Sequence, residues 1–181
     1  VNYALLPRLN AFLDLQYRRV HYRFLGLNRQ GENVEEDVTL HFFNPKGGLF
    51  YTLGERAELY ASFAVANREP NRNDYVESTV DSRPESERLY NTELGYRVNW
   101  NEAALNVTVY HMLYRDQLAL NGQINDVGAY TRINIDRSYR LGVELSGGVA
   151  LADGLRLDGN AAFSRNKVDR FTEYVDVYDE N

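Results

Sequence analysis

The chain has 181 residues, a formal net charge of -6 and a pI near 5.1, and its 22 phenylalanines and tyrosines far outnumber its 4 prolines. The acidic balance and the lack of a basic stripe exclude nucleic acid as a partner. The absence of cysteine excludes disulfides and thiolate metal sites. The aromatic content favours strands over helices.

Hydropathy predicts no membrane helix. No run approaches the ~18 apolar residues that such a helix needs, and the mean hydropathy is -0.52. This test is insensitive to transmembrane strands, in which apolar and polar residues alternate. Residues 1–10 carry neither the charged nor the apolar segment of a signal peptide, so we expect no signal peptide here.

Alternation with period two predicts seven strands. The pattern is clearest at residues 89–118, where Leu94 and Tyr96 share one face and Glu93 and Arg97 share the other. In chain order, the predicted strands are residues 10–24, 38–53, 56–67, 89–100, 103–118, 130–151 and 155–170.

The first of these strands changes the phase of its alternation. Leu13 and Leu15 lie in one phase, whereas Tyr22 and Phe24 lie in the other. We expect either a β-bulge near Arg18 or the departure of the strand from its apolar surroundings at that point.

Long and short connections alternate strictly along the chain. The long ones are residues 25–37, 68–88 and 119–129, and the short ones are residues 54–55, 101–102 and 152–154. An antiparallel meander places every second connection at the same end of the sheet. We therefore expect all long connections at one end of the sheet and all tight turns at the other.

The apolar face is confined to about ten residues beside each tight turn, which is the depth that a tilted transmembrane strand needs. The opposite face carries charges of both signs, which are costly in a dry core but suit a wet lumen. The residues predicted to face this lumen include Glu58, Glu93, Arg97, Asn106, Glu144, Arg156 and Asp158. The expected fold is all-β, an antiparallel up-and-down meander that forms part of a large transmembrane β-barrel.

Several segments resemble TonB-dependent outer-membrane receptors. Residues 43–51 (Phe-Asn-Pro-Lys-Gly-Gly-Leu-Phe-Tyr), residues 59–63 and residues 68–72 (Arg-Glu-Pro-Asn-Arg) are similar to the middle of such barrels. Residues 93–96 and 142–145 also lie where these receptors carry similar segments. The order and spacing of the segments, rather than any single one, carry the resemblance.

The resemblance spans roughly residues 7–176 and implies a barrel of about 22 strands around a plug domain. Residues 1–181 are accordingly expected to be a partial barrel of about seven strands, with the plug and the remaining barrel outside this sequence. Because the apolar band lies beside the tight turns, we expect those turns to face the periplasm and the long connections to face the cell exterior. The implied function is active import of a scarce nutrient complex, such as a ferric siderophore, across the cell outer membrane. The implied partners are outer-membrane lipid, the receptor's own plug and remaining barrel, the TonB energy complex acting through that plug, and the small ligand.

Three other functions are weighed from the residues alone. An outer-membrane barrel hydrolase would need a Ser/His or Asp/His pair on the side of the long connections, where only His21 and His111 could serve, without evident partners. A soluble glycan-binding β-sandwich would keep the alternation but would not explain an apolar band at one end of the strands. A passive outer-membrane porin would share the band and lack a plug.

The sequence predicts no enzyme, no catalytic residue, no cofactor and no metal site. His21, His41 and His111 lie on separate predicted strands without the spacing of a metal site. Neither a nucleophile elbow nor a P-loop is present.

The longest predicted connection, residues 68–88, is the candidate ligand contact. Arg68 and Arg72 offer forked donors suited to a carboxylate or phosphate, and Tyr75 offers a flat amphipathic surface. We expect these residues, with Asp74, to hang over the barrel mouth and contact the ligand. The alternative is a solvated loop whose charges pair among themselves.

Overall fold

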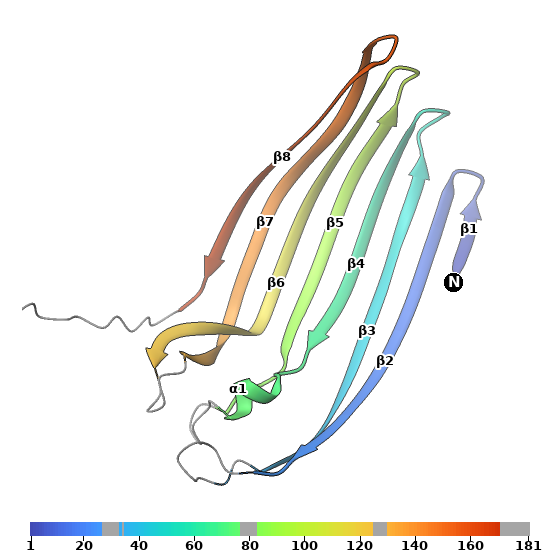
Figure 1. The fold of residues 1–181 in the computed structure, drawn as a ribbon. Helices are drawn as coiled ribbons and strands as arrows, with labels where there is room; N and C mark the ends of the chain where they lie inside the picture. Colours follow the sequence, from blue (N-terminus) through green and yellow to red (C-terminus); the bar gives the residue numbers. More distant parts are fainter. Residues whose placement is uncertain (27–32, 34, 77–82, 125–129, 171–181) are drawn as a thin grey trace, which may run out of the picture.

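The computed structural model describes residues 1–26, 33, 35–76, 83–124 and 130–170. They form one eight-stranded antiparallel sheet in which every strand pairs with its neighbours in sequence (Figure 1). The strands are β1 (Asn2–Leu6), β2 (Leu9–Phe24), β3 (Glu36–Thr52), β4 (Ala57–Arg68), β5 (Glu87–Asn99), β6 (Ala103–Ile124), β7 (Tyr130–Ala152) and β8 (Leu155–Val168). The predicted all-β meander is confirmed.

The sheet has eight strands where seven were predicted. The additional strand β1 pairs with β2 through Tyr3 and Ala11. It is only 5 residues long, too short for a period-two pattern to stand out, and Pro7 follows it directly in a tight turn. This strand is a correction to the sequence-based prediction.

Two of the long connections differ in structure from the prediction. β6 continues to Ile124, so residues 119–124 are strand and not loop. The connection after β4 contains a short helix, α1 (Arg72–Val76), which the sequence pattern did not reveal. In the described part of the chain, no helix has the length and apolarity needed to cross a membrane.

The predicted β-bulge in β2 is wrong. β2 and β3 pair in one unbroken register from Leu9 opposite Tyr51 to Phe24 opposite Glu36. The change of phase in β2 therefore reflects a change in the surroundings of its two faces and not a break in the backbone.

The two ends of the sheet differ. Tight turns cluster at one end, whereas α1 and the longer connections lie at the other (Figure 1). Gly54 and Gly154 adopt φ angles of 93° and 78° in two of the tight turns, a conformation that most residues with a side chain avoid. We call these the turn end and the loop end.

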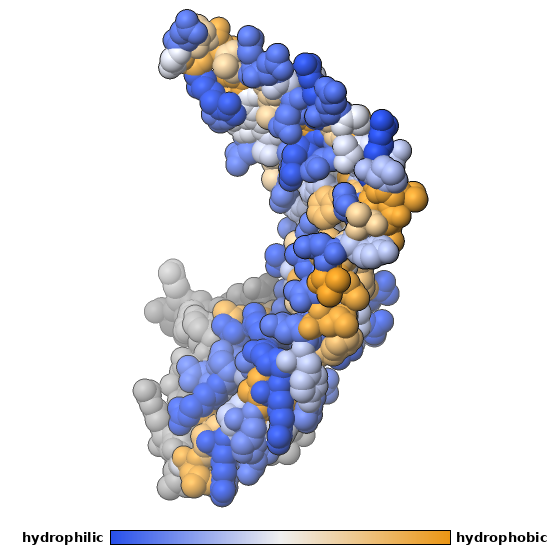
Figure 2. Space-filling model, turned by 90° about the vertical axis from the view of Figure 1, so that its right-hand side faces the viewer, coloured by the Kyte–Doolittle hydropathy of each residue, from blue (hydrophilic) through white to orange (hydrophobic). Residues whose placement is uncertain are grey.

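The two faces of the sheet also differ. The strands curve into a trough, and apolar side chains gather at mid-height on its convex side (Figure 2). The exposed apolar residues of β2 to β8 include Leu13, Leu15, Leu49, Tyr51, Leu59, Phe63, Leu94, Tyr96, Leu105, Val109, Leu141, Leu157 and Phe163. Register aligns them across neighbouring strands, as in the row formed by Tyr51, Leu59, Tyr96 and Val107.

On the concave face, tyrosines lie across glycines of the neighbouring strand. A Cβ atom added to Gly95 would stand 1.9 Å from the Tyr60 ring, and one added to Gly142 would stand 2.5 Å from the Tyr110 hydroxyl. The Tyr60 hydroxyl also hydrogen-bonds Thr108 Oγ1 at 2.7 Å. These glycines give the rings room to lie along the concave wall, so the wall stays smooth.

Most buried side chains of the described residues lie at the loop end. They are Phe42, Tyr75, Tyr114, Leu118 and Ile135, together with Pro70 and Asp74. Ser138 is also buried there. Along the rest of the described sheet, Val98 and Thr108 are buried, whereas most large apolar side chains are exposed on the convex face. Burial among the described residues is therefore concentrated at the loop end.

Candidate ligand-binding site

The candidate site begins where β3 and β4 separate. Their pairing ends at Lys46 opposite Ala64, whereas β2 and β3 stay paired to the end of β2. Side-chain amides bridge the gap, because the backbone N–H and Nδ2 of Asn67 both donate to Asn44 Oδ1, at 3.1 and 2.7 Å. The β2–β3 hairpin therefore leaves the sheet while remaining tied to β4.

The segment that follows β4 folds into this gap. Arg18 Nη1 donates to Glu69 Oε1 at 3.0 Å, and its second terminal nitrogen donates to the other carboxylate oxygen. The guanidinium carbon of Arg18 lies 4.9 Å from the centre of the Phe42 ring. The Tyr22 hydroxyl donates to the carbonyl of the fully buried Pro70 at 3.3 Å. These contacts fix the start of the connection to β2.

Both titratable groups in this contact have shifted pKa values. Burial opposes ionisation of Glu69, but the hydrogen bond and positive charge of Arg18 outweigh it and lower the pKa of the carboxyl. Burial, followed by the hydrogen bond with Tyr75, raises the pKa of the Tyr22 phenol. At neutral pH, Glu69 is therefore ionised and paired, and Tyr22 remains a neutral donor.

Helix α1 is capped and anchored by its own residues. The backbone N–H of Asn71 donates to Asp74 Oδ2 at 2.8 Å, and the N–H of Asp74 donates to Asn71 Oδ1 at 3.1 Å. This reciprocal pair satisfies donors at the start of the helix. The Tyr75 ring packs edge-on against Tyr22, with centroids 5.8 Å apart, and lies 6.5 Å from Phe24.

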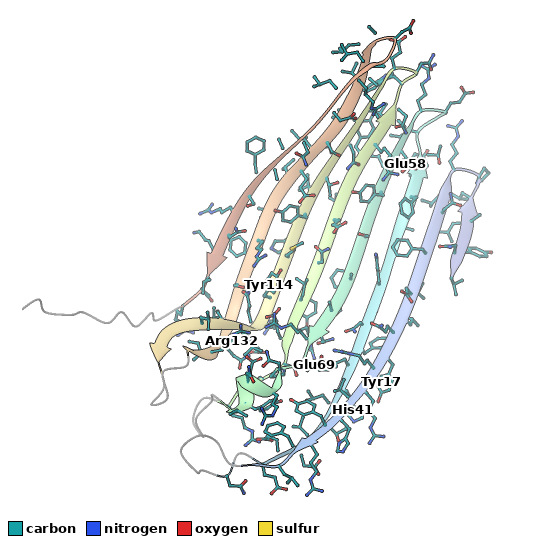
Figure 3. The ribbon with its side chains drawn as sticks, viewed as in Figure 1. Tyr17, His41, Glu58, Glu69, Tyr114 and Arg132 are labelled. Atoms are coloured by element: carbon teal, nitrogen blue, oxygen red, sulfur yellow. The ribbon has the colours of Figure 1, made fainter. Side chains whose placement is uncertain are left out.

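The far side of the connection is tied to β3 and β7. Arg132 Nη1 lies 3.5 Å from Asp74 Oδ1, and the Asn134 side chain makes hydrogen bonds to both the N–H and the carbonyl of Glu85, at 2.7 and 3.0 Å. Arg83 forms an ion pair with the first residue of β3. Figure 3 shows Glu69 and Arg132 on opposite sides of α1. The connection is thus held from both directions.

A pocket of about 680 Å³ lies between the outer half of β2 and the segment from β4 to α1. Its lining consists of Arg18, Val20, Tyr22, Arg23, Phe24, Asn67, Arg68, Glu69, Pro70, Asn71 and Arg72. Four of these residues are arginines and only one is acidic, so the pocket favours an anionic group.

Two of the four arginines have close carboxylate partners. Arg18 pairs with Glu69, and Arg23 Nη2 lies 3.1 Å from Glu35 Oε1. Arg68 is 4.0 Å from Glu87, and its side chain is 53% exposed. The guanidinium of Arg72 lies over the Phe24 ring at 5.4 Å. Arg68 and Arg72 are therefore the donors best placed to receive a ligand anion.

The four residues predicted to contact ligand occupy different environments. Arg68 and Arg72 line the pocket. Asp74 and Tyr75 are only 6% and 8% exposed, so the expectation that all four side chains hang over the mouth is wrong for this pair. Their caps and ring contacts hold the connection in place, and their role in ligand binding stays a prediction.

The predicted lumen residues lie on the polar face of the strands, opposite the apolar band. Near the turn end, Arg97 pairs with Glu58 at 2.8 Å, and Arg156 pairs with Asp158 at 2.9 Å. Arg97 and the Arg156–Asp158 pair line a second pocket of about 580 Å³, which also contains Asn106. Figure 3 places Glu58 near the tight turns, far from Glu69 and Arg132.

The remaining predicted lumen residues form no ion pairs with other described residues. Glu93 accepts a hydrogen bond from Asn91 at 2.7 Å, and Asn106 Nδ2 lies 3.4 Å from Thr108 Oγ1. Glu144 lies directly opposite Thr108 across the β6–β7 ladder. Among the residues described, no three histidine, cysteine or acidic side chains gather into a possible metal site.

Sequence analysis missed the half of the site that β2 supplies. Arg18, Tyr22 and Phe24 lie about 50 residues before the segment that they contact, and no local pattern joins the two. The available signal was the change of phase in β2, which turns Tyr22 and Phe24 toward the concave side.

The fold and the paired faces define a wall segment of a large antiparallel barrel with a polar lumen and an apolar exterior. The family model described as TonB dependent receptor-like, beta-barrel matches residues 1–180. The chain belongs to this family.

Solved structures of such receptors share the fold. The FrpB iron transporter from Neisseria meningitidis (F5-1 variant) is 22% identical with a TM-score of 0.67, and the match covers 90% of this chain and 24% of that one. The copper transporter OprC is 14% identical with a TM-score of 0.74 and coverages of 91% and 28%. The siderophore receptor PirA from Pseudomonas aeruginosa is 17% identical with a TM-score of 0.69 and coverages of 92% and 30%.

This chain therefore spans 24% to 30% of the length of these structures. At these identities the similarity establishes the fold and does not identify a ligand. A comparison with curated protein sequences found no significant match.

Proposed function

We propose that this chain forms part of the barrel wall of an outer-membrane receptor that imports a small, anionic nutrient complex, such as a ferric siderophore. The observation that carries the proposal is the placement of an arginine-rich pocket at the loop end of a sheet whose convex face is apolar. Receptors and transporters for iron, siderophores and copper are among the structures with the same fold.

Under this proposal the chain resides in the cell outer membrane and contacts lipid through its convex face. Its remaining partners are a plug domain and further barrel strands of the same receptor, the TonB energy complex acting through that plug, and the ligand. Arg68 and Arg72 form charge-assisted hydrogen bonds with carboxylates of the ligand.

The test uses cells in which the full-length receptor is the sole import route, supplied with ⁵⁵Fe-labelled ferric citrate, ferric catecholate and ferric hydroxamate complexes. We expect saturable uptake of an anionic complex that an uncoupler abolishes, because TonB-driven import needs the proton-motive force. Uptake that survives the uncoupler would identify a passive porin instead.

A paired substitution locates the contact. Arg68→Gln/Arg72→Gln should weaken binding of the imported complex by about tenfold or more, since each charge-assisted hydrogen bond contributes about 1.5 to 3 kcal/mol. The matched control, Arg97→Gln/Arg156→Gln, removes the same charge near the turn end and should leave binding within about twofold. Equal affinities for the two double variants would remove the pocket from the binding site.

A further inference from the structure

The convex face changes character in ordered rows toward the loop end. Strand register places Leu94, Val109, Val143 and Phe163 in one row across β5 to β8. Four residues farther along β5, a second row contains Tyr90, Leu113, Tyr139 and Lys167. Beyond it, Arg88, Arg115 and Arg137 lie directly opposite one another across β5, β6 and β7. We call this last set the arginine row.

The charged side chains on the convex face of β4 to β8 are all basic. From the turn end to the arginine row, the outward positions of β4 to β8 contain no acidic residue. Their only cations are Arg88, Arg115, Arg137, Arg165 and Lys167, and all five lie at the loop end. The whole chain has 26 acidic and 20 basic residues, so this segregation runs against its composition.

The arginine row has little compensation within the protein. Like charges directly opposite on neighbouring strands destabilise a sheet. Arg88 Nε donates to Asn67 Oδ1 at 3.0 Å, but the side chains of Arg115 and Arg137 form neither a hydrogen bond nor an ion pair with any residue that the structure describes. All three arginines are exposed. Within the part of the chain that the structure describes, the row therefore lacks compensating anions.

The depth of the row suits a lipid headgroup. Leu94 lies near the middle of the apolar band, and Arg88 is six positions farther along the same strand. Six residues of strand rise about 20 Å, which is about 14 Å along the membrane normal at a tilt of about 45°. Half of a ~30 Å hydrocarbon layer is about the same depth. Tyr90 and Tyr139 then lie at the interface, where aromatic girdles occur.

We propose that the arginine row binds the phosphate groups of anionic lipids in the membrane leaflet at the loop end. A planar guanidinium fork matches two phosphate oxygens, and phosphates between neighbouring arginines relieve their mutual repulsion. The inference rests on the proposed function only in requiring that the barrel spans a membrane. It concerns the convex face, whereas the ligand pocket lies between β2 and the β4–α1 segment.

The experiment uses the full-length receptor released in a neutral detergent. Native mass spectrometry measures its binding of diphosphoryl lipid A and of lipid A stripped of phosphate. The row variant is Arg88→Gln/Arg115→Gln/Arg137→Gln. It is compared with Arg97→Gln/Arg140→Gln/Arg156→Gln, which removes the same charge from the concave face, where Arg140 of β7 lies over the Tyr114 ring at 5.1 Å. The row variant should bind diphosphoryl lipid A about tenfold or more weakly, whereas the concave variant should match wild type within about twofold.

Phosphate dependence is the decisive readout. Lipid A without phosphate should bind weakly to wild type, to the row variant and to the concave variant, with equal affinity for all three. Three results would each overturn the inference. Wild type and the row variant could bind diphosphoryl lipid A equally, or the concave variant could lose as much binding as the row variant. Alternatively, the wild-type receptor could be a dimer that dissociates only in the row variant, which would make the arginine row a protein interface.

Two further measurements keep the outcomes distinct. If the row variant fails to fold, the triple Arg→Lys variant keeps the charge without the fork, and it should bind more weakly than wild type while retaining phosphate dependence. Insertion into phosphatidylcholine vesicles, scored by protease resistance, tests the spanning barrel separately. A wild-type receptor that inserts but binds both lipid A forms alike contradicts only the arginine row, whereas one that never inserts contradicts the proposed function as well.

Discussion

The strands differ between the half nearest the turn end and the half nearest the loop end, which we call the turn half and the loop half. In the turn half, the apolar side chains, such as Leu94 and Val109, are exposed on the convex face, and the charges face inward. In the loop half of β2, Tyr22 and Phe24 turn toward the concave side and pack against Tyr75. The register of β2 and β3 is continuous through this change.

The difference shows that the surroundings, and not the backbone, decide which face of a strand is apolar. Under the proposed function, lipid outside the turn half favours an apolar convex face and permits a polar concave face. Water outside the loop half removes that demand, while α1 on the concave side creates an ordinary buried interface. A strand that crosses from one setting to the other must change the phase of its alternation.

The sharpest test of the two halves is their accessibility on intact cells. In a cysteine-free full-length receptor, Asn73→Cys in the exposed part of α1 should react with a membrane-impermeant maleimide. Asn101→Cys and Asp153→Cys, in tight turns, should react only after the outer membrane is permeabilised. We expect an all-or-none contrast, and the reverse pattern would invert the proposed orientation.

The next largest effect is expected from a charge on the lipid side of the turn half. Val107 and Asn106 are neighbours in β6 that face opposite sides. Val107→Arg should cost about 2 to 4 kcal/mol or block assembly, whereas Asn106→Arg should be tolerated by a wet lumen. Unfolding of the receptor from vesicles by denaturant measures both. Similar losses for the two variants would contradict the assignment of faces.

A smaller and more local effect is expected in the loop half. Tyr75→Ala removes a buried ring from the cluster with Tyr22 and Phe24, and should weaken the docked segment by about 3 kcal/mol. Hydrogen exchange of residues 69–76 should rise while that of β5 stays unchanged. Tyr75→Phe keeps the ring and should cost about 1 kcal/mol through the lost hydroxyl contact. Equal exchange in both variants would show that the ring does not hold the segment.

The sequence was informative in the turn half because one face of the strands is apolar and the other polar, which gives a strict period of two. There the two faces and the tight turns followed from local patterns. The loop half depends on contacts between distant segments, such as Arg18 with Glu69 and Arg132 with Asp74. Helix α1 has only 5 residues, and β1 has the same length, so neither is long enough to show a period.

The smallest expected effect tests the contribution of the ion pair between Arg18 and Glu69 to the stability of the loop half. Glu69 has a pKa below its ordinary value because Arg18 stabilises the carboxylate against the opposing effect of burial. A lowered folded-state pKa gives stability that is fully present above the ordinary value near 4.5 and is lost as pH falls through the folded-state value. Hydrogen exchange of residues 69–76, corrected for its intrinsic pH dependence, should therefore stay constant from pH 7 to about pH 5 and rise below pH 4.5. Glu69→Gln cannot ionise, so its exchange should already be raised at pH 7 and show no further step on acidification. A step of the same size in Glu69→Gln would assign the acid sensitivity to another carboxyl group.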